Sequence, residues 1–134
     1  MNGAATPGHA QPGKLWRAWL PVAAYAALIF VLSSRPSLVE QVPNRLRFLG
    51  IDRVGHCAEY GILGWLAARA LAANGVRRTR RLWLGLALAS LYGATDELHQ
   101  AFVPGRSCQA GDWLADTVGG ALGSWLRCGD GPKK

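Results

Sequence analysis

The sequence predicts an all-α protein, a small polytopic bundle of four transmembrane helices with both termini in the cytoplasm. Half of the 134 residues are apolar, and they gather in four runs separated by charged or Pro- and Gly-containing connections. Residues 19–32 and 82–94 are apolar on every side, whereas the helices of a small soluble bundle need polar outer faces. A chain of this length has room for one domain. These observations favour membrane insertion over a soluble helical core.

The N-terminal part of the chain is predicted to hold a tail, one span and a loop. Residues 1–14 are rich in Gly, Pro and Ala and lack an apolar face, so they are expected to be disordered. Residues 16–34 form the first span, which we interpret as uncleaved because it is long and is followed by no small-x-small cleavage site. Residues 35–52 are expected to form a loop with short amphipathic pieces along the membrane surface.

Three further apolar runs complete the predicted bundle. They cover residues 54–73, 82–102 and 113–126. The last run is short beside the roughly 20 residues that a span usually needs, so its helix is expected to begin earlier than the run itself. The transmembrane domain as a whole is predicted to cover residues 15–128, followed by a short polar tail at residues 129–134.

The distribution of charge predicts the orientation of the bundle. The connection at residues 74–81, NGVRRTRR, holds four Arg and no acid, and basic connections of this kind stay in the cytoplasm. With both termini on the same side, the cytoplasmic segments hold ten basic residues and one acid, and the outer segments hold five basic residues and seven acids. A net charge of +7 would suit nucleic acid if it covered a soluble surface. Here the basic residues lie between apolar runs, so no nucleic-acid partner is predicted.

Polar residues gather at the predicted outer ends of the second, third and fourth spans. On each helix they lie three or four residues apart and therefore share a face. Ionisable residues within spans are costly and usually face the bundle interior or a wet cavity. We therefore expect one outward-facing polar pocket built from three helices. The residues that share these faces are Asp52, His56 and Glu59 on the second span, Tyr92, Asp96 and His99 on the third, and Asp112 and Asp116 on the fourth.

A structural interpretation of the same residues stays open. His56 with Glu59, or Arg106 with Asp112, can be pairs that fix helix packing. Arg106 lies in the Pro-Gly turn at residues 103–107, which presents its side chain. The rigid fork of an Arg suits phosphate or carboxylate, so the side chain is a candidate for either a lipid phosphate or one of the acids.

The spacing of two ionisable residues raises the question of a metal. His56-x-x-Glu59 resembles the spacing by which one helix supplies two metal ligands. With Glu97 and His99, a set of two histidines and two carboxylates can be written. Coordination has to be argued from geometry, so neither a metal nor a cofactor is predicted.

Small residues are assigned to packing. Gly119 and Gly123 give the fourth span a small-xxx-small surface, which lets helix backbones approach closely. Cys57, Cys108 and Cys128 are an odd number without CxxC spacing. They are interpreted as incidental small apolar residues, with a Cys57–Cys108 disulfide as the alternative.

Three blocks of the sequence carry motifs that occur together. They read Asp52-Arg53-x-x-His56-x-x-x-Tyr60-x-x-Leu63, Thr95-Asp96-Glu97-Leu98-His99-Gln100-Ala101-Phe102-Val103-Pro104-Gly105-Arg106, and Asp112-x-x-x-Asp116-x-x-Gly119-x-x-x-Gly123. Over residues 16–126 the chain resembles the VanZ-like family. One departure is Asp116, where family members often have Asn, so the pocket is more acidic here. The candidate pocket residues that the resemblance implies are His56, Glu59, Tyr60, Asp96, Glu97, His99, Gln100, Arg106, Asp112 and Asp116.

The resemblance implies a multi-pass protein of the bacterial cytoplasmic (inner) membrane. The family takes its name from a member linked to resistance to teicoplanin, a glycopeptide antibiotic with a fatty tail. We therefore expect the chain to handle or sense an amphiphile in the outer leaflet, in envelope maintenance or in tolerance to lipoglycopeptide antibiotics. Arg106 would meet an anionic head group, and the acids would bind a cationic group or position a proton-transferring His.

Two other functions stay open beside this one. The first is a membrane hydrolase or transferase acting on a lipid-linked substrate, with His56 or His99 as the base. The second is a non-catalytic subunit whose polar residues pack helices or dock a partner. The expected partners are membrane lipids or an amphiphilic ligand, and a homo-oligomer or a membrane partner protein is the alternative.

Overall fold

The computed structural model of the chain describes residues 15–35 and 50–129, which form helices and connections with no strand among them. The prediction of an all-α protein is therefore confirmed within these residues. The predicted N-terminal tail, residues 36–49 of the predicted surface loop and residues 130–134 lie outside them. The helices are η1 (Trp16–Trp19), α2 (Leu20–Ser33), α4 (Ile51–Ala73), α5 (Arg78–Gln100) and α6 (Ala110–Gly129).

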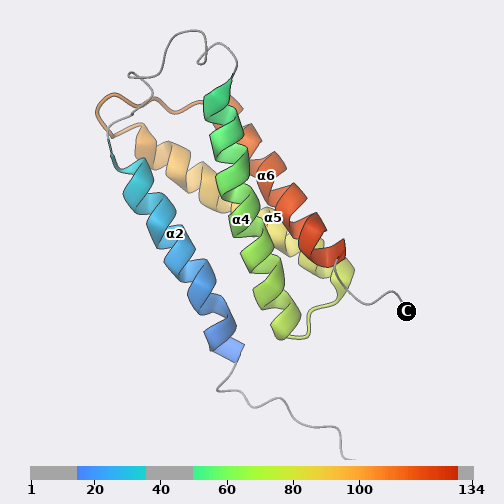
Figure 1. Ribbon diagram of the computed structural model, residues 1–134. Helices are drawn as coiled ribbons and strands as arrows, with labels where there is room; N and C mark the ends of the chain where they lie inside the picture. The colour runs from blue at the N-terminus through green and yellow to red at the C-terminus, as the bar shows by residue number, and fades with distance from the viewer. Residues whose placement is uncertain (1–14, 36–49, 130–134) are drawn as a thin grey trace, which may run out of the picture.

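Successive long helices run in opposite directions (Figure 1). Helices α2 and α5 therefore finish at the same end of the bundle at which α4 and α6 begin, and this end is called the polar end below. Helices α4 and α6 pack together along most of their length, and α5 packs against both of them. Helix α2 has fewer contacts, mostly with α4. The three best-packed helices thus each bring one terminus to the polar end.

Two helices begin earlier than their apolar runs suggest. Helix α5 begins at Arg78 rather than at residue 82, because Arg forms helix readily and the turn before it is short. In that turn the Asn74 side chain donates to the Ala70 carbonyl at 2.8 Å, and Gly75 adopts a φ of 73°. Helix α6 begins at Ala110 and has 20 residues, or about 30 Å at the usual rise. This confirms the expectation that the fourth helix extends beyond its apolar run.

The backbones of α4 and α6 approach each other closely at several glycines. A Cβ atom on Gly119 would meet the carbonyl oxygen of Cys57, and a Cβ atom on Gly123 would meet that of Gly61. Only glycine leaves room for a backbone at such a distance. The two residues assigned to packing from the sequence therefore lie at the α4–α6 contact.

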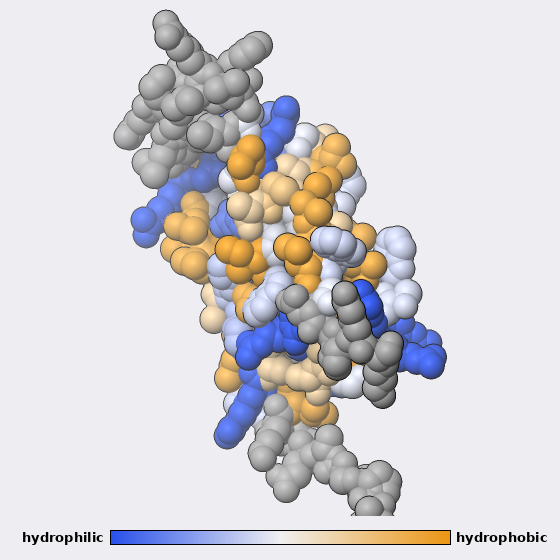
Figure 2. Space-filling model, turned by 45° about the vertical axis from the view of Figure 1, so that its right-hand side comes forward, coloured by the Kyte–Doolittle hydropathy of each residue, from blue (hydrophilic) through white to orange (hydrophobic). Residues whose placement is uncertain are grey.

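The interior of the bundle contains many small and polar residues beside a small hydrophobic cluster, whereas many large hydrophobic side chains lie on the exterior. Buried residues include Ala67, Ala68, Ala70 and several glycines, while large hydrophobic side chains such as Leu91 and Phe102 are exposed. Figure 2 shows hydrophobic residues across the middle of one face and strongly hydrophilic residues toward the two ends. Soluble proteins place their charged residues outside. The buried polar and charged residues here are Ser33, Asp96, Glu97, Gln100, Asp112, Asp116 and Ser124.

Helix length and composition identify one potential membrane span among the described residues. It is the continuous helical segment Trp16–Ser33, which consists of η1 followed by α2. Helices α4, α5 and α6 are each 20 or more residues long, but they carry ionisable residues that the first segment lacks in its centre.

The three cysteines lie in different surroundings. Cys57 is half-buried in α4, Cys108 is exposed after α5, and Cys128 is buried in α6. All three are free thiols. The Cys57–Cys108 disulfide, considered as an alternative from the sequence, is therefore wrong.

Candidate functional site

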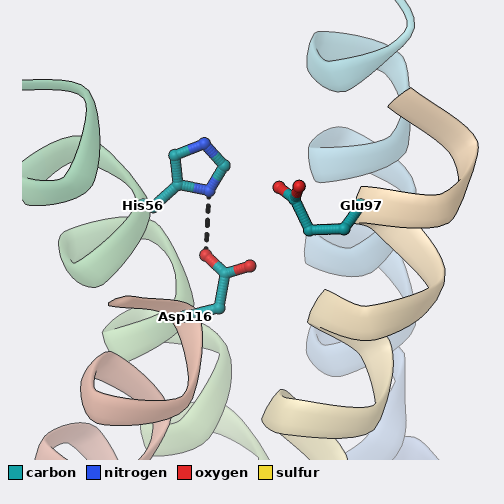
Figure 3. A group of neighbouring side chains, drawn as sticks. All are labelled: His56, Glu97 and Asp116. Atoms are coloured by element: carbon teal, nitrogen blue, oxygen red, sulfur yellow. Dashed lines mark hydrogen bonds and ion pairs between the residues drawn. The ribbon is translucent and has the colours of Figure 1, made fainter. Parts of the chain in front are cut away.

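Three ionisable side chains from three helices converge at the polar end (Figure 3). They are His56 of α4, Glu97 of α5 and Asp116 of α6, and together they are called the inner site. Nδ1 of His56 donates a hydrogen bond of 2.9 Å to Oδ1 of Asp116. One nitrogen or oxygen atom of each side chain lies within 4.8 Å of those of the other two. Asp116 is fully buried and Glu97 is 3% exposed, so the two carboxylates face each other inside the bundle.

The packing of the helices creates the space for Asp116. Helices α4 and α6 are in backbone contact one turn further along, at Gly119, and this brings His56 and Asp116 within hydrogen-bond reach. On α5, Gly93 lies opposite Asp116, and a Cβ atom there would come within 2.9 Å of the Asp116 side chain. Gly93 was not recognised from the sequence. Its position four residues before Glu97, on the same helix face, is the signal that identifies it.

A second set of polar residues joins α5 to the end of α2. Nε2 of Gln100 donates to Oδ2 of Asp96 at 2.8 Å, and Nη1 of Arg106 donates to Oε1 of Gln100 at 3.3 Å. Arg106 also donates to the carbonyl oxygens of Arg35, at 3.2 Å, and Leu32, at 3.5 Å. A cation is favourable at a helix C-terminus. Arg106 therefore holds the loop after α5 against α2, and its guanidinium is engaged on several sides.

Two further contacts fix the start of α6. Oε2 of Glu97 accepts a hydrogen bond of 2.7 Å from the backbone N–H of Gln109. Nε of Arg53 lies 3.6 Å from Oδ1 of Asp112. The basic residue that pairs with Asp112 is therefore Arg53 and not Arg106. The pairs considered from the sequence, His56 with Glu59 and Arg106 with Asp112, are therefore wrong, because the helices bring other partners closer. Gln109 gave no signal in the sequence, since it contributes only its backbone.

The family of the chain is decided by a match that covers almost its whole length. A protein-family model described as VanZ/LLP1 matches residues 12–128. The chain belongs to the VanZ/LLP1 family. This confirms the resemblance drawn from the three motifs. Comparisons with curated proteins and with solved structures give no match.

One predicted helix face of this VanZ/LLP1 protein is divided between two neighbours. Nε2 of His99 lies 3.0 Å from Oγ of Ser34, and the His99 ring lies 4.7 Å from that of Phe30. Oη of Tyr92 donates to the Ala26 carbonyl at 2.6 Å. Tyr92 and His99 therefore face α2, and Glu97 rather than His99 joins the inner site.

Glu59 and Tyr60 flank the inner site on α4. Glu59 is half-buried and lies close enough to His56, Asp116 and Arg106 for their charges to act on it. Tyr60 is fully buried, and its ring lies 6.3 Å from that of Tyr92. Within the described part of the chain, the buried Tyr60 hydroxyl has no hydrogen-bond partner.

An apolar groove of about 310 Å³ follows the seam between α4 and α6. It begins at Cys57, next to His56, and continues past Gly119, one turn beyond Asp116. Small residues and large hydrophobic ones line it together. The lining residues are Cys57, Ala58, Gly61, Ile62, Trp65, Gly119, Leu122, Gly123 and Leu126.

Proposed function

We propose that this VanZ/LLP1 protein crosses the bacterial cytoplasmic membrane four times, with the polar end at the outer face. The distribution of side chains supports this proposal, since large hydrophobic residues are exposed on every long helix while carboxylates are buried. Helices of 20 to 23 residues are long enough to cross the hydrocarbon core. The basic connection between α4 and α5 supports a cytoplasmic position for the opposite end.

The orientation predicts the result of reporter fusions. Fusions after Lys134 and within residues 75–80 are expected to be active only with a reporter that works in the cytoplasm, because both sites lie on the basic side of the bundle. The measurement is the ratio of alkaline phosphatase to green fluorescent protein signal at each site. A periplasmic signal from either fusion would contradict the orientation and place the inner site on the cytoplasmic face.

The function that the geometry supports best is binding of an amphiphile whose head group carries positive charge. The observation that carries it is an excess of carboxylates inside an apolar bundle. Asp96, Glu97 and Asp116 are buried and Glu59 is half-buried beside them, and charges within a membrane protein usually serve a ligand or each other. In the cell, such binding would serve envelope maintenance or tolerance to lipoglycopeptide antibiotics such as teicoplanin.

The groove between α4 and α6 gives this proposal a place for the apolar part of the ligand. Its lining is almost entirely apolar, and it begins beside His56. An acyl chain lying there would keep its head group within one or two helical turns of the inner site. Trp65 and Leu126 would form the far end of the contact.

Photocrosslinking tests the proposal. The full chain is reconstituted in vesicles of phosphatidylethanolamine and phosphatidylglycerol with a trace of either lipid carrying a photoreactive acyl chain. The amine-bearing probe is expected to label α4 and α6 along the groove, and Glu97→Gln is expected to reduce that labelling about tenfold, as loss of a charged hydrogen bond predicts. The control is Asp52→Asn, a half-buried acid of α4 outside the inner site. Equal labelling by both probes, unchanged in Glu97→Gln, would contradict binding at this site.

One observation favours catalysis as a second candidate. Asp116 binds Nδ1 of His56 and thereby orients the ring, which leaves Nε2 as the atom that can move a proton. A hydrolase or transferase acting on a lipid-linked substrate would use this pair. Release of the head group from the vesicle lipid, lost in His56→Gln while labelling persists, would support catalysis over binding alone.

A further inference from the structure

The inner site contains lone pairs that no group of the described chain uses. Oε1 of Glu97 and Oδ2 of Asp116 are buried without a hydrogen-bond partner. The two side chains are 3% and 0% exposed, so solvent does not compensate them. A buried acceptor that is left unpaired costs free energy, and an ionised one costs more. Both oxygens belong to side chains that converge on His56 (Figure 3).

No basic side chain of the described residues neutralises these two carboxylates. Arg106 donates to Gln100 and to two backbone carbonyls at the end of α2. Arg53 pairs with Asp112, one turn before Asp116. Among residues 15–35 and 50–129, the ionic partner of these carboxylates is His56, which pairs with Asp116. The inner site therefore has two negative charges and at most one positive charge among the groups described.

The donor set and its geometry fit a divalent metal ion. An imidazole nitrogen with two carboxylate oxygens is a ligand set that Zn²⁺ and Mn²⁺ accept. Nδ1 of His56 and Oδ1 of Asp116 are 2.9 Å apart, close to the roughly 3 Å between neighbouring ligand atoms around an ion with bonds of about 2.1 Å. The ligand atoms of all three residues lie within 4.8 Å of one another. A small movement of the Glu97 side chain would therefore bring its carboxylate within bonding distance of an ion held by His56 and Asp116.

We infer that His56, Glu97 and Asp116 bind one divalent metal ion, Zn²⁺ or Mn²⁺, between α4, α5 and α6. The ion takes the place of the proton shared by Nδ1 and Oδ1, and it balances the two carboxylates. The hydrogen bond from the Gln109 backbone to Oε2 of Glu97 orients that carboxylate from outside the site. Three protein ligands leave coordination positions open for water or for a ligand. This ligand set differs from the two histidines and two carboxylates considered from the sequence, because His99 faces α2 and Asp116 lies beside His56 instead.

The inference goes beyond the proposed function, and the ion needs no lipid. Because the ion would neutralise Glu97 and Asp116, a positive head group and the ion are expected to compete for the inner site. The test uses the full chain, purified in detergent without a tag and carrying His9→Ala, so that His56 and His99 are the only histidines of the three left. Zn²⁺ is titrated by calorimetry, and Mn²⁺ is followed by electron paramagnetic resonance because thiols hold it weakly. One ion per chain is expected, with release of protons on binding.

Matched variants locate the ion. Asp116→Asn keeps the size of the side chain and its acceptor for His56, and it is expected to weaken binding of both metals at least about tenfold, as is Glu97→Gln. Glu59→Gln and His99→Gln change the same residue types at the polar end. His99→Gln is expected to leave the affinity unchanged, and Glu59→Gln to weaken it by no more than about threefold, because its charge acts on the site only through space. Zn²⁺ should raise the midpoint of thermal unfolding of the parent chain but not of Asp116→Asn.

Two results would overturn the inference. The first is the absence of stoichiometric binding by a chain that unfolds cooperatively. The second is a loss of affinity in Glu59→Gln or His99→Gln as large as that in Asp116→Asn. Lipid photocrosslinking repeated in the presence of a chelator tests the proposed function separately, so failure of one leaves the other measurable.

Discussion

Gly123→Ala is expected to unfold the bundle or to lower its stability by about 3 kcal/mol, the upper part of the usual range for overpacking. The new Cβ atom would overlap sterically with the carbonyl group of Gly61, and a backbone group cannot rotate away as a side chain does. Gly119→Ala is expected to act in the same way against Cys57. The measurement is thermal unfolding in detergent, with an expected decrease in Tm of about 10 °C for a chain of this size.

The matched control is Gly55→Ala. Gly55 is a helical glycine of α4 that is exposed, and a Cβ atom on it would meet nothing within 4 Å. Alanine is favoured over glycine in a helix interior by about 0.5–1 kcal/mol, so this variant is expected to keep or slightly raise the Tm. An unchanged Tm in both Gly119→Ala and Gly123→Ala would show that α4 and α6 do not meet at these residues.

Leu88→Arg is expected to impair membrane insertion. Leu88 lies near the middle of α5 and is 41% exposed, so the proposed four-span arrangement places it against lipid. An Arg at the centre of a span costs about 2.5–3.5 kcal/mol, whereas an exposed substitution in a soluble protein usually changes stability by less than about 0.5 kcal/mol. The measurement is the fraction of protein that resists carbonate extraction from membranes.

Leu98→Arg is the control at a different depth. Leu98 is 63% exposed and lies on the same helix near the polar end, where a long basic side chain reaches the interface. It is expected to insert like the parent chain. If Leu88→Arg and Leu98→Arg both resisted carbonate extraction as well as the parent chain does, the middle of α5 would not lie against lipid. This result would contradict the multi-pass proposal.

Much of the polar end could be predicted from the chain because helix periodicity is local. The spacing of Asp112 and Asp116 places both on one helix face, and both are buried. The same reasoning placed Tyr92, Asp96 and His99 together on one face of α5. Of these three, only Asp96 is buried, whereas Tyr92 and His99 are half-buried and make hydrogen bonds to α2 and its C-terminal end. A helical face spans several neighbours, and spacing alone does not say which neighbour each residue meets.

By itself, the sequence determined the helical class, the family and the residue types that gather at one end of the bundle. These depend on apolar runs, local spacing and motifs, all of which are properties of neighbouring residues. The tertiary structure alone decided the partners: His56 with Asp116, Asp112 with Arg53, and Arg106 with the end of α2. The reason is that the rotation and separation of each helix are fixed by packing between distant segments. In this chain the contacts at Gly119 and Gly123 set that packing, and through it the composition of the inner site.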